Sequence, residues 1–206
     1  HRNEFQYNKR LIFVSSKIKT KYVKLESDDD YFLPDSLLKS INFLEKKKDY
    51  SAVFGRCGIY SSYNNEVYIN SIFNHHKSLT DNSSNDRLRK YFSNYSPALY
   101  YSVTRKEVFL KNIKVLKQSI LNYGNEYEKF AEIHLPISIC LNGKIKVLND
   151  MFWIRKDDDI KNRIPFNTIK KIEKKPGDYS IMFNDLYKKI KRNYFKKFIF
   201  NLIKYN

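Results

Sequence analysis

The chain has few cysteines and no long hydrophobic run. Only Cys57 and Cys140 are present among its 206 residues, and neither has a partner at the short spacing of a metal site. We therefore expect two reduced, buried thiols, as is usual in cytosolic proteins. No apolar run approaches the roughly 20 residues of a membrane-spanning helix, and no signal peptide opens the chain. These absences favour a soluble protein.

Acidic residues are also scarce relative to basic ones. Asp and Glu total 22 against 39 Lys and Arg, which gives a formal net charge of +17. Such an excess is typical of proteins that bind nucleic acids or anionic membranes. Here the lysines are spread along the chain, which is also rich in residues with A/T-rich codons, so we attribute part of the charge to genome composition. We expect no specific nucleic-acid partner, and keep a basic nucleic-acid-binding module as the alternative.

Length and composition predict one substantial globular domain. The chain is 42% hydrophobic and shows no internal repeat or heptad pattern. We place the domain at residues 1–155, followed at 156–206 by a charged linker and a C-terminal amphipathic helix. That helix has a broad aromatic face and a lysine-rich flank. It can cover the core of the domain or make a peripheral contact with an anionic membrane.

Hydrophobic periodicity predicts strands that alternate with helices. The predicted helices cover residues 9–18, 34–47, 85–92, 105–121, 126–141 and 180–205. The predicted strands cover residues 21–26, 50–60, 66–73, 98–103 and 144–155. This alternation is typical of an α/β domain with a mostly parallel sheet flanked by helices.

Three consecutive aspartates, Asp28, Asp29 and Asp30, lie between a predicted strand and a helix that begins at Pro34. Adjacent carboxylates repel one another unless a cation lies among them, and their hard oxygen atoms suit Mg²⁺ or Mn²⁺. In open α/β sheets, ligands bind at such turns. A divalent metal site is therefore the favoured interpretation, and a solvated acidic turn is the alternative.

The segment 20–34 resembles the central segment of GT-A-fold, family-2-like glycosyltransferases. In that family a strand of the type T-x-Y-V leads into a D-x-D-D motif, which a proline-started helix follows. The metal-binding aspartate of the family falls on Asp29, with Asp30 beside it, and the resemblance implies both as metal ligands. The first aspartate of the motif falls on Ser27. This departure leaves open how metal and donor contacts are divided, so we nominate Ser27, Asp28 and Asp29 for donor binding.

A second match lies downstream. Family members carry an acidic residue on a helix, followed eleven residues later by a glycine and then a strand, and here Glu132 precedes Gly143 at that spacing. The resemblance implies that Glu132 is the general base. Many relatives place a metal-binding histidine on the strand that follows. This chain has none there, and the resemblance assigns the closing contact with the donor diphosphate to Arg155.

Two other arginines, Arg87 and Arg105, match weaker motifs of one branch of the family. Contact with a ligand and pairing with helix ends or carboxylates explain them equally well. The histidines at 75, 76 and 134 are interpreted as structural or solvated rather than as metal ligands.

The resemblance implies metal-dependent, inverting transfer of a sugar from a nucleotide-diphosphate donor to a hydroxyl of a glycan or lipid-linked acceptor, as in the synthesis of cell-surface polysaccharides. We expect a cytoplasmic protein, or one peripheral to the inner face of the membrane. The nucleotide-binding half of the family is missing before Tyr22. We therefore expect an N-terminally truncated GT-A domain that can be inactive alone, with a non-catalytic relative as the alternative.

Overall fold

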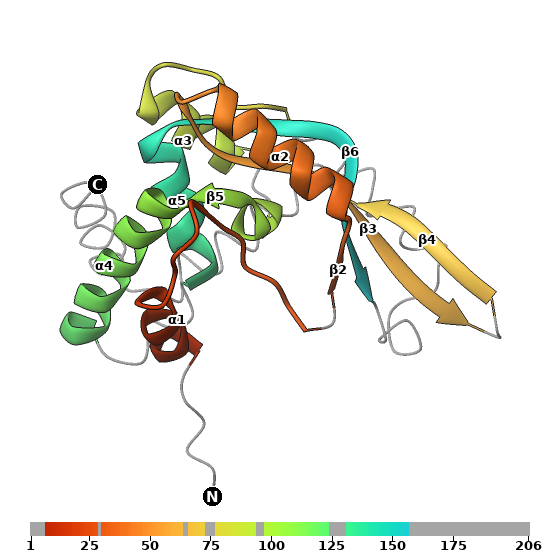
Figure 1. The fold of residues 1–206 in the computed structure, drawn as a ribbon, viewed down its shortest axis with the longest axis horizontal. Helices are drawn as coiled ribbons and strands as arrows, with labels where there is room; N and C mark the ends of the chain where they lie inside the picture. Colours follow the sequence, from red (N-terminus) through yellow and green to blue (C-terminus); the bar gives the residue numbers. More distant parts are fainter. Residues whose placement is uncertain are drawn as a thin grey trace, which may run out of the picture.

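The fold of the chain is built from alternating helices and strands (Figure 1). The computed structural model describes residues 7–28, 30–63, 66–72, 77–93, 97–123 and 131–156. The helices are α1 (Tyr7–Ser15), α2 (Pro34–Lys46), α3 (Ser84–Ser93), the 3₁₀ helix η1 (Pro97–Tyr101), α4 (Lys106–Tyr123) and α5 (Ala131–Asn142). The strands are β1 (Tyr22–Val23), β2 (Asp30–Phe32), β3 (Tyr50–Tyr63), β4 (Glu66–Ile72), β5 (Val103–Arg105) and β6 (Lys144–Lys156).

The strands form one mixed sheet in the order β1-β5-β3-β6-β2, and β4 pairs with β3. Only β3 and β6 are parallel, whereas the other pairs among the described strands are antiparallel. The α/β class is confirmed, but the prediction of a mostly parallel sheet is wrong. Periodicity shows which residues are buried and carries no information on strand direction, and here β3 turns directly back into β4 as a hairpin.

The long parallel pair of β3 and β6 forms the centre of the sheet. Its register runs from Tyr50 opposite Lys144 to Tyr60 opposite Lys156, with shifts near Gly55. A Cβ atom on Gly55 would lie 2.7 Å from the Asp150 carbonyl oxygen and 2.8 Å from Cβ of Phe152. Because these distances are too short for a side chain, glycine at this position lets the two backbones approach.

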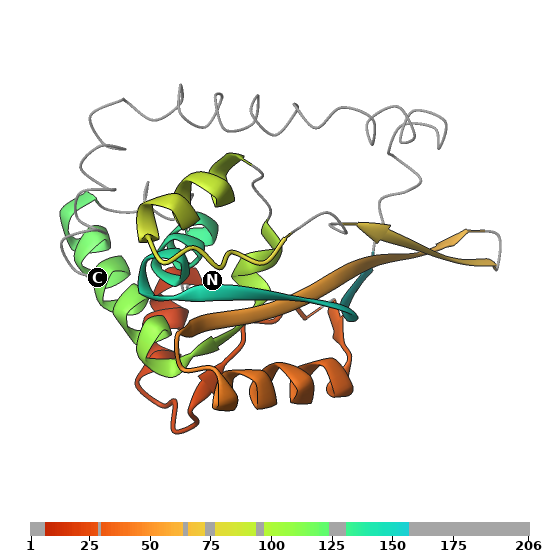
Figure 2. The same ribbon diagram turned by 90° about the horizontal axis from the view of Figure 1, so that it is seen from above.

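Helices cover both faces of this central pair. Figure 2 shows α2 against one face, with α3 and α5 on the opposite side. The apolar core is contributed mainly by β3, η1, α4, α5 and β6, and its largest fully buried side chains include Phe152, Trp153, Leu44, Leu99 and Leu116. The free Cys57 and Cys140 are buried in it, as predicted.

Two predicted strands differ from the structure. The strand predicted at 21–26 shortens to Tyr22–Val23, because its partner β5 is itself only three residues long. The strand predicted at 98–103 becomes the 3₁₀ helix Pro97–Tyr101 followed by β5. Consecutive buried residues fit a buried helical turn as well as a strand. The C-terminal helix predicted at 180–205 lies outside the described residues.

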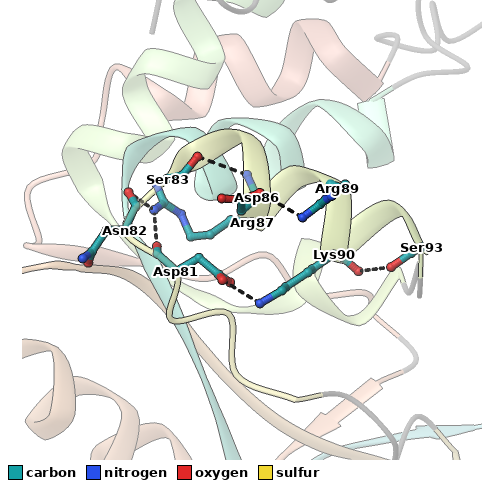
Figure 3. Close-up of polar contacts among 8 residues, drawn as sticks. All are labelled: Asp81, Asn82, Ser83, Asp86, Arg87, Arg89, Lys90 and Ser93. Atoms are coloured by element: carbon teal, nitrogen blue, oxygen red, sulfur yellow. Dashed lines mark hydrogen bonds and ion pairs between the residues drawn. The ribbon is translucent and has the colours of Figure 1, made fainter.

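Arg87 joins α3 to the end of α5. Its side chain is buried, and its Nε donates a hydrogen bond to the carbonyl oxygen of Cys140 at 2.8 Å. Nη1 donates to the carbonyl oxygens of Asp81 at 2.6 Å and Asn82 at 2.9 Å (Figure 3). Arg87 therefore stabilises a helix end and the loop before α3.

Arg105 plays the equivalent part at the end of α2. Its Nη2 donates to the carbonyl oxygens of Leu44 at 2.6 Å and Lys47 at 2.9 Å, and its Nε donates to that of Tyr50 at 2.7 Å. Helix-end pairing thus accounts for both arginines.

Replacing Arg87 by Met should lower the free energy of unfolding by about 3 kcal/mol, because buried carbonyl groups would lose a charged donor. The matched control is Arg89→Met on the same helix, where the side chain is 76% exposed and pairs with Asp86 at 3.0 Å. The control should change the free energy by less than about 0.5 kcal/mol. Urea unfolding measures both, and equal losses in the two variants would contradict the assignment.

Candidate functional site

The structure brings Asp30 and Arg155 together at the pairing of β2 with β6. The two residues are cross-strand partners, and Nε of Arg155 lies 4.0 Å from Oδ1 of Asp30. The Asp30 side chain is 0% exposed and that of Arg155 is 47% exposed. A buried carboxylate therefore lies next to a guanidinium group that reaches solvent. Both residues were predicted site residues, and they come from distant parts of the chain.

Aromatic packing fixes the position of β2 against β6. The ring of Phe32 stacks on Trp153 with a centroid distance of 6.4 Å and meets Phe152 edge-on at 5.9 Å. On its other side Trp153 meets Tyr101 at 4.6 Å. Because Phe152 and Trp153 are fully buried, these contacts secure the short edge strand that carries Asp30.

The negative charge of Asp30 raises the pKa of a buried thiol in the sheet. Burial raises the pKa of the Cys57 thiol to about 12, the charge of Asp30 adds to this rise, and Arg155 opposes it. A thiol with such a pKa stays protonated at neutral pH and is a poor nucleophile. Cys57 is thus a core residue beside the site and not a reactive group of it.

Lys24, which the sequence did not mark out, also lies at this edge. Its Nζ lies over the ring of Phe32 and 5.6 Å from the ring centroid of Phe152. Burial lowers the pKa of Lys24 from 10.5 to about 7, although Glu26 and Asp30 act in the opposite direction. The alternation of the predicted strand placed Lys24 on a polar face. Its contacts with the rings of Phe32 and Phe152 arise only when β2 pairs with β6, which no local pattern reveals.

The other predicted site residues are placed only in part. In the turn before β2, the Asp30 N–H donates to the Ser27 carbonyl oxygen at 3.2 Å, and Asp28 is exposed. Asp29 lies outside the described residues. Glu132 is in the first turn of α5, where its backbone is described and its side chain is not. The geometry thus joins Asp30 and Arg155 and leaves the position of the Glu132 carboxylate open.

His134 of α5 is fully buried, and burial lowers its pKa well below 6.5. It is therefore neutral at physiological pH and belongs to the core, as predicted for a structural histidine. The predicted His75 and His76 lie outside the described residues.

A hard divalent cation fits the chemistry of the turn that precedes α2. Its donors are carboxylate oxygens, with Asp30 in β2 and Asp28 two residues before it, and Mg²⁺ and Mn²⁺ prefer such oxygen ligands. Within the described ranges, which omit Asp29, no cluster of three or more His, Cys, Asp or Glu residues could hold a metal by itself. The described carboxylates would therefore need further ligands from elsewhere.

No protein-family model matches the chain, and no curated protein matches it at a significant level. The fold and the site therefore define an α/β domain with a mixed sheet and an Asp–Arg pair at its edge. In the part of the chain that the structure describes, no helix has the length and apolar character needed to cross a bilayer.

Replacing Lys24 by Met should stabilise the fold most at low pH. Below about pH 7 the folded state contains the charged, partly buried lysine. Between about pH 7 and 10.5 the folded state releases this proton while the unfolded state keeps it, so the stability of the unmodified protein rises with pH. The advantage of Lys24→Met should therefore shrink across this range.

Urea unfolding of both proteins near pH 6 and near pH 9.5 measures this change. The control is Lys21→Met, because the Lys21 side chain is 80% exposed. A stability difference between Lys24→Met and the unmodified protein that is the same at both pH values would contradict the burial of a charge at Lys24.

Proposed function

We propose that this chain is the catalytic part of a GT-A-type glycosyltransferase, which transfers a sugar from a nucleotide-diphosphate donor to an acceptor hydroxyl. The observation that carries the proposal is the pairing of Asp30 with Arg155, 4.0 Å apart, directly before α2. A donor diphosphate bound with a divalent cation needs both an anionic group for the metal and a cationic group for the phosphate oxygens. This edge offers the two side by side.

In this proposal Asp29 and Asp30 would hold Mg²⁺ or Mn²⁺, and Asp28 would contact the donor. The metal would neutralise negative charge on the departing diphosphate. Arg155 would contact the same diphosphate, because its guanidinium group is half exposed and presents several N–H donors to phosphate oxygens. Ser27 would line the donor side of the turn.

Glu132 would act as the general base. Its carboxylate would accept the proton of the acceptor hydroxyl while that oxygen attacks the anomeric carbon and the bond from this carbon to the diphosphate breaks. Attack on the face opposite the leaving group predicts inversion. The acceptor would be a glycan or a lipid-linked sugar, reached from the cytoplasmic side of the membrane.

The connection between α5, which carries Glu132, and β6, which carries Arg155, is short and tightly packed. Gly143 joins α5 to β6, and a Cβ atom there would lie 2.8 Å from the Ser51 amide nitrogen and 3.0 Å from the Asp49 carbonyl oxygen. The close approach excludes larger residues and ties the start of β6 to the start of β3. The junction fixes how the C-terminal end of α5 and the start of β6 lie against β3, which a site shared by these elements requires.

Replacing Asp30 by Asn should weaken Mn²⁺-dependent binding of UDP or GDP at least about tenfold, because a neutral amide is a poor metal ligand. Isothermal titration with and without MnCl₂ measures this binding. The matched control is Asp35→Asn, an exposed residue in the first turn of α2, which should bind as the unmodified protein does. Metal-independent binding, or equal losses in both variants, would contradict the metal site.

Replacing Glu132 by Gln should leave nucleotide binding intact and slow turnover by about 10²- to 10⁴-fold, because only the proton acceptor is lost. The measurement is release of nucleoside diphosphate from a panel of UDP- and GDP-sugars. Glu107→Gln, in the first turn of α4, is the control and should keep full activity. Undiminished turnover by Glu132→Gln would remove Glu132 from the mechanism.

A further inference from the structure

The ammonium group of Lys24 has few partners for a charge that is partly buried. Its Nζ donates one hydrogen bond, to the Leu25 carbonyl oxygen, at a long 3.4 Å. Among the described residues no carboxylate lies within 4.0 Å of it, whereas six other lysine and arginine side chains form ion pairs closer than that limit. An ammonium group has three donors, so most of its hydrogen-bonding capacity is open.

The surroundings of Lys24 hold the group in place. The aromatic faces of Phe32 and Phe152 lie against Nζ, and a cation is attracted to such faces. Phe32 is two residues after Asp30 on β2, and Phe152 is three residues before Arg155 on β6. The rings that position Lys24 therefore belong to the two strands that carry the Asp30–Arg155 pair.

We propose that Lys24 is a second phosphate-binding residue at this edge, which together with Arg155 binds the diphosphate of the nucleotide beside Asp30. The inference rests on the proposed function, and it names a residue that neither the aspartate motif nor the resemblance singled out. Lys24 comes from the connection between β1 and β2, whereas Arg155 comes from β6. The two cations would thus approach the phosphate groups from different segments.

The charges around Lys24 determine how its protonation state responds to a bound ligand. Glu26 and Asp30 favour its charged form, but desolvation outweighs them. Two other cationic residues, Lys17 and Lys19, line the same groove between α1, β1 and α4 as Lys24 does. Other titratable groups at the β2–β6 edge are the guanidinium of Arg155 and the protonated thiol of Cys57.

A diphosphate at this edge would add negative charge in a partly desolvated place and would strongly favour the ammonium form. Binding of the nucleotide should therefore be accompanied by uptake of a proton by Lys24 at pH values above about 7. A lysine remote from the bound diphosphate would show no such uptake.

The test is isothermal titration of the full chain with UDP and MgCl₂ near pH 6.5 and near pH 8.5. At each pH, two buffers of different ionisation enthalpy give the number of protons taken up. The variants are Lys24→Met, Lys24→Arg and, as control, the exposed Lys21→Met. Circular dichroism verifies that each variant is folded.

The unmodified protein and Lys21→Met should take up about one proton near pH 8.5, where UDP itself is fully ionised, and should bind about tenfold more weakly there than near pH 6.5. Lys24→Arg should bind at both pH values without proton uptake, because a guanidinium group stays charged. Lys24→Met should bind at least about tenfold more weakly than the unmodified protein near pH 6.5.

The outcomes separate the two proposals. If the unmodified protein does not bind UDP with Mg²⁺ at all, the proposed function fails and this inference fails with it. If the unmodified protein binds UDP but takes up no proton, or if Lys24→Met binds as tightly as Lys21→Met, Lys24 is not a phosphate ligand and the proposed function stands.

Discussion

The parallel pairing of β3 with β6 is the interaction on which the rest of the structure depends. At one end of the pair, Gly143 packs against the backbone of Ser51 and Asp49. Midway, Gly55 lets the backbones of β3 and β6 approach each other closely. Beyond that point β6 carries Phe152 and Trp153, whose burial holds β2 in place. A slip of one residue would move every following side chain to the opposite face. The Asp30–Arg155 pair therefore depends on the register that β6 keeps with β3 beyond Gly55 and with β2 at its far end.

The charged side chains of this very basic chain differ in how strongly they can interact with a partner or a ligand. In the described parts of the chain, six ion pairs closer than 4.0 Å join side chains that are mostly well exposed, such as Lys48 with Glu45. Pairs of this kind contribute little to stability. The charges at the β2–β6 edge differ, because Asp30 is fully buried and Lys24 is partly buried. Burial strengthens electrostatic interactions. Position, and not the net charge, therefore identifies the groups suited to binding an anionic ligand.

Local chemistry made several features predictable. Pro34 starts α2, and Gly143 separates α5 from β6. The family resemblance, and not local chemistry, nominates Arg155, which the structure places 4.0 Å from Asp30. Strand direction was not predictable, because a strand covered by helices on both faces has the same burial pattern beside parallel and antiparallel neighbours. The environment of Lys24 was equally hidden, since its contacts with Phe32 and Phe152 arise only when β2 pairs with β6.

The remaining site residues are Asp29 and Glu132. Asp29 lies outside the described residues, and the side chain of Glu132 is not placed. Their roles as metal ligand and general base stay predictions that derive from the resemblance and its spacing. The structure adds the pairing of β2 with β6, which places Asp30 beside Arg155.

The most direct test of a metal–diphosphate site at the β2–β6 edge is paramagnetic broadening of backbone amide signals by Mn²⁺ in the presence of UDP. The account predicts that substoichiometric Mn²⁺ broadens the signals of Asp30–Phe32 and of residues 154–156 before all others, and that omission of UDP reduces the effect. Selective broadening at exposed acidic positions such as Asp35 or Asp86, with the signals of Asp30 and Arg155 unchanged, would contradict it.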